Sequence, residues 1–371
     1  MTDNTALVVW LLDFLPDHVL LPDREALNGG LELEAVSGDA GFRSYYRLNT
    51  QPTLIAVQAP PETENNLDFV RKGLTLAKAG VHVPRIYAVD FSAGFLLLED
   101  LGDRLFLAEL QETPQAPVYW PGLETLLQIQ SILTSNAEPL EGGQSSAGPV
   151  FPDYSVEILD REMQLFPHWF VEQLLGLSLQ PNERSLLQET FNSLSASALA
   201  QPQVVVHRDY QIRNLLLLES GGVGVIDYQD ALIGPITYDL VSLLRDCYIY
   251  LPEAQIDSYV EEYLSRISAN SAKMGARGFE SLSDSAVFRR WFDLMGLQRH
   301  IKVLGIFARL YLRDNKPRYL AELPLFIRYI MEVTERYPET QPFRHWFSER
   351  VLPELPQQDW YFPWETAGER E

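Results

Sequence analysis

The sequence has little cysteine and no long hydrophobic run. A single cysteine, Cys247, excludes an intrachain disulfide and fits a reducing cytoplasm. Its apolar setting, LLRDCYIYL, predicts a buried thiol. The N-terminal segment MTDNTALVVWLLDFLPDH holds an apolar run of about ten residues, which is too short to span a bilayer. Because the segment carries Asp13 and lacks a basic flank, we interpret it as a helix rather than a signal peptide, and we predict no transmembrane span.

Basic residues and histidine are also scarce. The chain has 29 lysines and arginines against 51 aspartates and glutamates, and its formal net charge is -22. This charge argues against binding along a nucleic-acid backbone and against docking on an anionic membrane, so an anionic ligand must meet a local basic patch. Five of the six histidines are scattered without the spacing of metal ligands, so zinc is not supported. These are His18, His82, His168, His300 and His345.

The residues that are present predict an α+β chain of two lobes. With 371 residues, 46% of them hydrophobic, the chain can bury a large core. A small β-rich lobe is expected over residues 1–100, with one helical stretch at 65–80 that stops at Gly80. Strands are expected at 53–60, 85–91 and 94–100, and two more within 31–48.

Helical periodicity dominates residues 101–371, which we expect to form a larger, mainly helical lobe. Helices are predicted at 120–134, 154–174, 182–199 and 286–313, and residues 134–152, rich in Gly, Ser and Pro, are predicted to form an exposed loop. The longest helix, 286–313, has apolar positions at helical spacing, which indicates a core face. These positions are Phe292, Met295, Ile301, Leu304 and Phe307.

A hairpin is predicted within residues 204–230, VVVHRDYQIRNLLLLESGGVGVIDYQD. Asp209 follows the apolar run VVV, and Asn214 stands at the start of the run LLLL. The second strand, VGVI, returns antiparallel after the turn ESGG and ends at Asp227. Asn214 and Asp227 should therefore lie side by side at one end of the hairpin.

These polar residues suit phosphoryl transfer. An amide oxygen beside a carboxylate offers the hard oxygen ligands that Mg²⁺ prefers, while substrate phosphates and water complete its coordination. Asp209 can accept or orient the proton of a substrate hydroxyl. The motif H-R-D-x-x-x-x-N, in which Asp is the base and Asn a metal ligand, is present as His207, Arg208, Asp209 and Asn214. We expect His207 itself to be buried and to shape the loop.

Five segments carry a resemblance to a known family. They are GDAGFRSYYRL (38–48), QAPPE (58–62), VHRDYQIRNLL (206–216), GVIDYQDALIGPITYDLVSLLRD (224–246) and LMGLQRHIKVLGIFARLYLRD (294–314). The chain resembles the aminoglycoside phosphotransferase and choline kinase superfamily, which has the two-lobed protein-kinase-like fold. Within it, the closest resemblance is to the bacterial kinases that phosphorylate the anomeric hydroxyl of N-acetylmuramate and N-acetylglucosamine. The first segment matches loosely, whereas the last three are long and specific.

The resemblance implies an enzyme that uses ATP and Mg²⁺. The segment LLLEDLGD (96–103) would join the lobes, with main-chain groups facing adenine, and a glycine loop would cover the phosphates. Taken alone, that glycine pair is weak evidence, because an ordinary hairpin turn is the more common explanation. The implied roles are catalytic base for Asp209, Mg²⁺ ligands for Asn214 and Asp227, adenine contacts around Glu99 and Leu101, and phosphate loop for Gly38 and Gly41.

The third strand departs from the family pattern. Kinases place a phosphate-pairing lysine in V-A-I-K, whereas Gln58 stands at that position here. The usual ion pair between that lysine and the following helix is therefore in doubt. Two interpretations remain open: a nearby arginine such as Arg43 supplies the charge, or Mg²⁺ and main-chain groups hold the nucleotide. The similar sugar kinases also lack a plain V-A-I-K, which argues against an inactive pseudokinase.

Arginines near the motif favour an anionic or heavily hydroxylated acceptor, such as a sugar with a lactyl carboxylate. Each arginine could equally form a structural ion pair with a neighbouring aspartate. The leading hypothesis is an amino-sugar anomeric kinase of peptidoglycan recycling whose product passes to a nucleotidyltransferase. The alternatives are an aminoglycoside, choline-type or homoserine-type kinase, and a nucleotide-binding pseudokinase scaffold. Candidate substrate contacts are Gln211, Arg213, Asp230 and Arg245, while Asp239 is expected to cap a helix or anchor a loop.

Overall fold

The computed structural model describes residues 4–20, 31–36, 42–112, 119–132, 149–274, 282 and 284–369. The chain divides into two compact units. The first comprises Met1–Gln128, Asn136–Val150 and Arg213–Ala231, and the second comprises Ile129–Ser135, Phe151–Ile212 and Leu232–Glu371. Residues 101–128 and 213–231 thus belong to the same unit as the N-terminal hundred residues.

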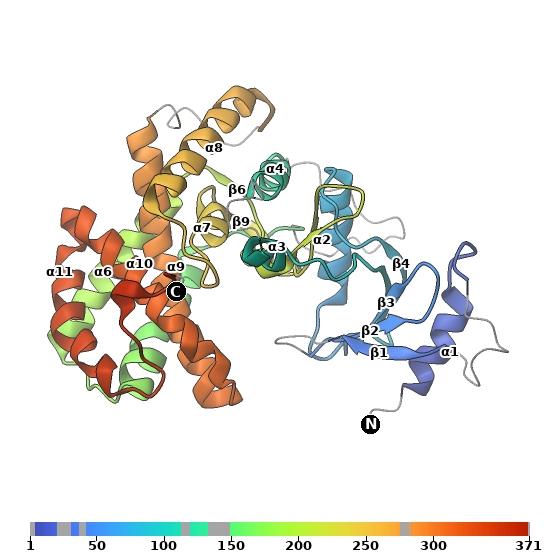
Figure 1. Cartoon of the computed structure of the whole chain (residues 1–371), viewed down its shortest axis with the longest axis horizontal. Helices are drawn as coiled ribbons and strands as arrows, with labels where there is room; N and C mark the ends of the chain where they lie inside the picture. The colour runs from blue at the N-terminus through green and yellow to red at the C-terminus, as the bar shows by residue number, and fades with distance from the viewer. Residues whose placement is uncertain are drawn as a thin grey trace. The chain divides into compact units, whose positions relative to one another are not determined.

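A five-stranded antiparallel sheet forms the centre of the first unit (Figure 1). Its strands are β1 (Leu33–Val36), β2 (Ser44–Leu48), β3 (Leu54–Gln58), β4 (Ile86–Asp90) and β5 (Phe95–Glu99), in the order β1-β2-β3-β5-β4. All five lie where the apolar runs predicted them. Helix α1 (Thr5–Phe14) buries Leu7 and Leu11 in one core with Tyr46 and Leu97 of the sheet, so the N-terminal apolar run is a helix of the core, as expected.

Helix α2 (Asn66–Lys78) begins and ends at capping residues. The side chain of Asn65 accepts a hydrogen bond from the main-chain N–H of Asp68 at 3.1 Å, which satisfies one of the free donors of the first turn. After the helix, Gly80 has a φ of +85°, a conformation that residues with side chains rarely adopt. Two further helices follow the sheet, α3 (Phe106–Glu112) and α4 (Tyr119–Gln130).

The predicted hairpin also belongs to the first unit. It consists of β7 (Leu215–Leu217) and β8 (Val223–Val225), which pair antiparallel. Its turn residues 221–222 are glycines with φ of +85° and +87°. The main-chain N–H of Val225 donates to the carbonyl of His82 at 2.8 Å, so the hairpin is fixed to the segment that precedes β4.

The longest helix of the second unit is α9 (Ser285–Asp314). The Asp284 side chain accepts from the N–H of Ala286 at 2.9 Å and starts the helix. A Cβ on Gly305 would lie 2.4 Å from the main-chain carbon of Leu165, so only glycine permits this close packing. The apolar positions predicted to face the core are buried except Phe307, which is half-buried: Phe292, Met295, Ile301 and Leu304.

Helices make up most of the rest of the second unit. They are α5 (Val156–Met163), α6 (Pro181–Leu199), α7 (Tyr238–Leu244), α8 (Glu253–Met274), α10 (Leu323–Arg336) and α11 (Gln341–Trp346). Its short 3-10 or π-helical segments are Phe166–Leu174, Pro317–Glu322, Pro338–Thr340, Phe347–Val351, Leu352–Gln357 and Trp364–Thr366, and a further one, Ile212–Asn214, lies where the chain passes from the second unit to the first. The single helix expected over 154–174 is divided in two, because Pro167 lacks an N–H and favours the first turn of a new helical segment.

A short two-stranded sheet in the second unit pairs β6 (Gln203–Val206) with β9 (Leu232–Pro235), and Val206 lies opposite Leu232. Strand β6 is the predicted run VVV. The sequence did not predict β9, since LIGP contains a glycine and a proline, and both residues disfavour strands.

None of the helices formed by the described residues is long and apolar enough to cross a membrane. Cys247 is buried, as predicted. Most of the loop expected at 134–152 lies outside the described residues.

Candidate active site

Asn214 and Asp227 lie next to each other at the open end of the β7–β8 hairpin in the first unit. The Asn214 Nδ2 atom lies 3.4 Å from Asp227 Oδ2. The main-chain N–H of Ile226 donates to the carbonyl of Asn214 at 3.1 Å and closes this end of the hairpin. The two side chains are therefore side by side, as the spacing predicted. Asp227 is exposed and Asn214 is half-buried, so an amide and a carboxylate, both suitable Mg²⁺ ligands, face outward together.

The main chain at Asp227 is strained. Its φ is +66°, a left-handed conformation that is uncommon for residues other than glycine. The Gln229 side chain donates from Nε2 to Asp227 Oδ1 at 2.6 Å. Gln229 thus orients the carboxylate, a role that the sequence did not predict, although the residue lies within the quoted segment IDYQD.

The segment that carries Asp209, in the second unit, is fixed at both ends by buried carboxylates. Asp239 of α7 accepts hydrogen bonds from the main-chain N–H groups of His207 at 2.6 Å and Arg208 at 3.0 Å. Asp246, just after α7, accepts from the N–H of Ile212 at 3.1 Å. Asp239 is therefore a loop anchor, one of the two roles expected for it. Burial raises the pKa of Asp239 to about 7, although the hydrogen bonds from the loop act in the opposite direction.

Arg208 is turned toward the interior of the second unit. Its φ is +76°, and its guanidinium forms an ion pair with Glu162. Lys302 Nζ lies 3.0 Å from Glu162 Oε2. Burial alone would favour the neutral form of Glu162, but the charges of Lys302 and Arg208 outweigh it and lower the pKa of this carboxyl. Arg208 thus has a structural partner, and the sequence did not identify Glu162, because other charged residues surround it on α5.

His207 is buried, as expected, and its ring lies edge-on to Tyr210 at 5.7 Å between centroids. Asp209 itself is half-buried. The N–H of Gln211 donates to the main-chain carbonyl of Asp209 at 2.8 Å, which makes a tight turn beside the candidate base.

Arg43 belongs to the first unit, as do the candidate metal ligands. Its guanidinium is 3.0 Å from Glu64 Oε2 and stacks over the ring of Phe69 at 5.0 Å. Burial raises the pKa of Tyr45 to about 12, and the charges of Arg43 and Asp227 act on this phenol in opposite directions. Arg43 therefore has Glu64 and Phe69 as direct partners, with Tyr45 nearby.

Gln58 is the last residue of β3 and pairs with Ser44 of β2. It stands where the kinase pattern has lysine, and the cation nearest in the sequence to that edge of β2 is Arg43, whose carboxylate partner is Glu64. The phosphate-loop glycines predicted at Gly38 and Gly41 lie outside the described residues.

The predicted connecting segment packs on the hairpin within the first unit. Glu99 ends β5, and its carboxylate accepts from the N–H of Arg85 at 3.0 Å and contacts His82 Nε2 at 3.2 Å. The Leu101 side chain covers Gly224 of β8, where a Cβ would lie only 2.8 Å from Leu101 Cδ1. The main chain around Glu99 and Leu101 is thus held against the strand that leads to Asp227.

Of the four predicted substrate contacts, Arg245 differs from the others. Gln211 and Arg213 are half-buried and Asp230 is exposed, whereas Arg245 is 1% exposed. Its guanidinium lies 2.8 Å from Asp293 Oδ1. A structural ion pair, the alternative to a substrate contact that was left open for Arg245, is therefore favoured. Its partner is Asp293 and not the neighbouring Asp246.

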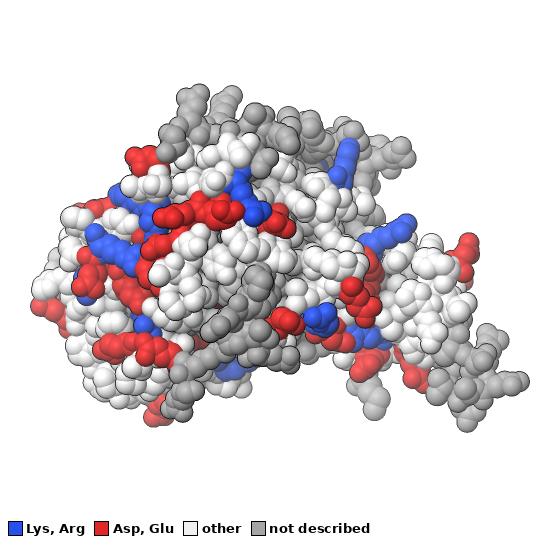
Figure 2. Space-filling model, turned by 45° about the horizontal axis from the view of Figure 1, so that its top comes forward, with Lys and Arg blue, Asp and Glu red and all other residues white. Residues whose placement is uncertain are grey.

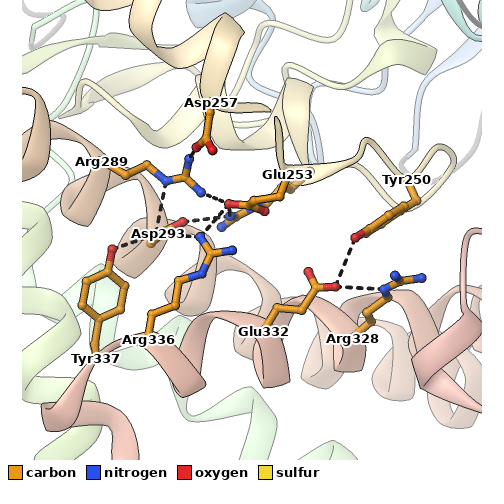
Figure 3. A network of polar contacts seen from close by, with 10 residues as sticks. Tyr250, Glu253, Asp257, Arg289, Asp293, Arg328, Glu332, Arg336 and Tyr337 are labelled. Carbon is orange, nitrogen blue, oxygen red and sulfur yellow. Dashed lines mark hydrogen bonds and ion pairs between the residues drawn. The ribbon is translucent and has the colours of Figure 1, made fainter. Parts of the chain in front are cut away.

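Arg245 belongs to a larger network of ion pairs in the second unit. Figure 3 shows Arg289 and Arg336 directed at Glu253 and Asp293. The Tyr337 hydroxyl donates to Asp293 Oδ2 at 2.7 Å. Asp257, which pairs with Arg289, is the third carboxylate of the network. Three arginines therefore face three carboxylates, and this charge balance leaves no excess positive charge for binding a separate anion.

The charged side chains on the surface are distributed as expected for an acidic chain (Figure 2). On the face shown in Figure 2, the basic side chains lie beside acidic ones over much of the described surface. A broad single-sign basic area is not seen on this face among the described residues.

Comparisons with known proteins place the chain among phosphotransferases. The family model described as "Phosphotransferase enzyme family" matches residues 32–276. An N-acetylmuramate/N-acetylglucosamine kinase of Pseudomonas aeruginosa is 40% identical over 309 residues, which cover 83% of this chain and 85% of the relative. A kinase of the same name from Neisseria meningitidis is 38% identical and covers 88% of this chain and 91% of the relative.

Among solved structures, a choline kinase from Cryptosporidium parvum aligns with a TM-score of 0.58 at 13% identity. The alignment covers 93% of this chain and 100% of that one. The predicted kinase-like fold, with a small antiparallel sheet and a mainly helical remainder, is confirmed.

Proposed function

The chain belongs to the phosphotransferase enzyme family, and we propose that it transfers the γ-phosphoryl group of ATP to the anomeric hydroxyl of N-acetylmuramate or N-acetylglucosamine. The enzyme class follows from the family and from the named kinases that are about 40% identical over most of the chain. The observation that carries the chemistry is the paired amide and carboxylate of Asn214 and Asp227.

We assign Asn214 and Asp227 as the protein ligands of Mg²⁺. The donor set fits, because an amide oxygen and an exposed carboxylate are hard ligands and leave the remaining positions to water and phosphates. When bound, Mg²⁺ neutralises charge on the phosphates of the nucleotide. Gln229 keeps the Asp227 carboxylate in one orientation before any ligand arrives.

We assign Asp209 as the base that accepts or orients the proton of the acceptor hydroxyl. Its loop is held by main-chain hydrogen bonds to Asp239 and Asp246, so the carboxylate is presented from a fixed backbone. Such preorganisation lowers the cost of reaching the reactive arrangement. For the nucleotide, we assign Arg43 to the phosphates and the main chain around Glu99 and Leu101 to the adenine, with Gly38 and Gly41 in the phosphate loop.

Three residues remain as substrate contacts in this proposal: Gln211, Arg213 and Asp230. Carboxylate and amide groups suit the hydroxyls of a sugar, and an arginine suits the lactyl carboxylate of N-acetylmuramate. We also propose that the reaction takes place in the cytoplasm during peptidoglycan recycling. Its sugar 1-phosphate product would then pass to a nucleotidyltransferase that forms a UDP-sugar.

A coupled ADP-release assay with Mg-ATP tests the proposal over N-acetylmuramate, N-acetylglucosamine, choline, homoserine and kanamycin. We expect turnover on one or both sugars and little on the other acceptors. Asp209→Asn should lower kcat about 10³-fold, because general-base catalysis contributes on that order. Asp359→Asn, which removes an exposed carboxylate, serves as the control. Absence of turnover on both sugars would refute the substrate assignment, and wild-type activity in Asp209→Asn would refute the base assignment.

A further inference from the structure

One face of α2 contacts Tyr228 and Gln229, the two residues that follow the candidate metal ligand Asp227. The ring of Phe69 stacks on that of Tyr228 with centroids 4.9 Å apart. A Cβ on Gly73 would lie 2.5 Å from the Tyr228 hydroxyl, so the helix backbone approaches this ring as closely as glycine allows. The Lys72 Nζ atom donates to the main-chain carbonyl of Gln229 at 2.6 Å. Positions 69, 72 and 73 share one side of a helix because they are three and four residues apart.

Lys72 is the charged member of this face. Its side chain is buried, with 4% of the residue exposed. A buried ammonium group is costly unless it is hydrogen-bonded, and a charged donor makes a stronger hydrogen bond than a neutral one. The carbonyl that receives this bond belongs to Gln229, whose side chain donates to Asp227 Oδ1 at 2.6 Å. Two hydrogen bonds therefore connect Lys72 through Gln229 to the Asp227 carboxylate.

We propose that Lys72 is a positioning residue that holds the 227–229 segment in the conformation needed for metal binding. It acts on Asp227 through Gln229. The inference rests on the metal role proposed for Asp227. In addition, Lys72 connects α2 to the metal-binding segment, while Arg43 and Glu64 connect the start of β2 to the turn before α2.

Lys72→Met, Lys72→Gln and Lys72→Arg test this inference, with Lys78→Met as the matched control. Lys78 lies on the same helix and is exposed. The first measurement is hydrogen–deuterium exchange of the purified full chain without metal or nucleotide. The informative amides are those of Ile226 and Ala231, which donate to the carbonyls of Asn214 and Tyr228. The second measurement is the Mg²⁺ concentration that gives half-maximal sugar kinase activity, together with the KM for the sugar.

We expect Lys72→Met to speed exchange in residues 226–231 about tenfold, since a hydrogen bond from a charged group is lost. The Mg²⁺ requirement should rise about tenfold, as is usual when a residue supporting a metal ligand is removed. The KM for the sugar should change less than about twofold, and Lys72→Arg should restore most of both properties. If Lys72→Met does not fold, Lys72→Gln carries the same expectations with smaller changes.

The inference is overturned if Lys72→Met, or Lys72→Gln in its place, matches Lys78→Met in both exchange and Mg²⁺ requirement. It is also overturned if the sugar KM rises as much as the Mg²⁺ requirement, because Lys72 would then act on the acceptor instead. A wild-type protein with no sugar kinase activity would count against the proposed function, and the exchange measurement would still test Lys72 independently.

Discussion

The carboxylate of Asp239 accepts a hydrogen bond from the main-chain N–H of Arg208 at 3.0 Å, and Arg208 is held at a φ of +76°. A left-handed conformation is costly for a residue with a long side chain, by about 1–3 kcal/mol. The same carboxylate binds the N–H of His207. One buried aspartate therefore stabilises the strained backbone immediately before Asp209.

Removing this anchor should affect both folding and catalysis. Asp239→Ala leaves the N–H groups of His207 and Arg208 without their acceptor, and the free energy of unfolding should fall by about 1–3 kcal/mol for each. Asp239→Asn keeps one acceptor oxygen and should lose less stability. Urea unfolding and kcat on the sugar are the measurements. Wild-type values of both in Asp239→Ala would show that the loop holds its conformation without the carboxylate.

Arg43 should contribute to nucleotide binding. Arg43→Met removes the cation assigned to the phosphates, and the KM for ATP should rise about tenfold, the loss of one charge-assisted contact. Glu64→Gln should raise it less, because it only releases the orientation of Arg43. Arg71→Met, on α2, is the control for loss of a positive charge. An unchanged KM for ATP in Arg43→Met would favour the other interpretation, in which Mg²⁺ and main-chain groups hold the nucleotide.

Loss of the Arg245 side chain should lower the free energy of unfolding. Its ion pair with Asp293 is buried on both sides, and breaking such a pair leaves a buried charge poorly compensated. Arg245→Met should lower the free energy of unfolding by about 3 kcal/mol. Arg290→Met breaks an exposed pair with Glu339 and should cost less than about 1 kcal/mol. The measurement is urea unfolding with the sugar KM beside it. A stable Arg245→Met protein with a raised sugar KM would instead support the substrate role first considered for this arginine.

Glu322 should make stability depend on pH. Burial raises the pKa of its carboxyl to about 7, with a further contribution from the charge of Asp246. Between about pH 4.5 and pH 7 the folded state holds a proton that the unfolded state has released, so this group's contribution to stability is lost as the pH rises through 7. Glu322→Gln cannot titrate, and its stability relative to wild type should therefore increase from pH 5 to pH 8.

Thermal unfolding at several pH values measures this difference for Glu322→Gln. The control is Glu335→Gln, which removes one exposed charge from the end of α10. A difference between Glu322→Gln and wild type that stays constant from pH 5 to pH 8, or that Glu335→Gln reproduces, would contradict the expectation.

Local patterns predicted the elements that depend on neighbouring residues. Apolar runs bounded by turn residues predicted the strands of the first unit, and the interval from Asn214 to Asp227 with its glycine turn predicted that the two side chains lie together. In both cases the chain within a dozen or so residues determines the geometry.

Contacts between distant segments could not be predicted in this way. Lys72 and Gln229 are 157 positions apart, and Arg208 and Asp239 are 31 apart. Arg245 shows the same limit, because its neighbour in the sequence is Asp246 while its partner in the fold is Asp293. Such pairs depend on how helices pack, which a hydrophobic period does not specify.

The close approach of Gly73 to Tyr228 restricts the sequences that this fold can accept. A Cβ at position 73 would lie 2.5 Å from the Tyr228 hydroxyl, and removing the hydroxyl alone would still leave Cζ at 3.1 Å. The two positions should therefore change together: where a relative carries alanine or a larger residue at position 73, a residue other than tyrosine is expected at position 228. Covariation of this pair across an alignment of the family would reveal α2 docked on the metal-binding segment without any further structure.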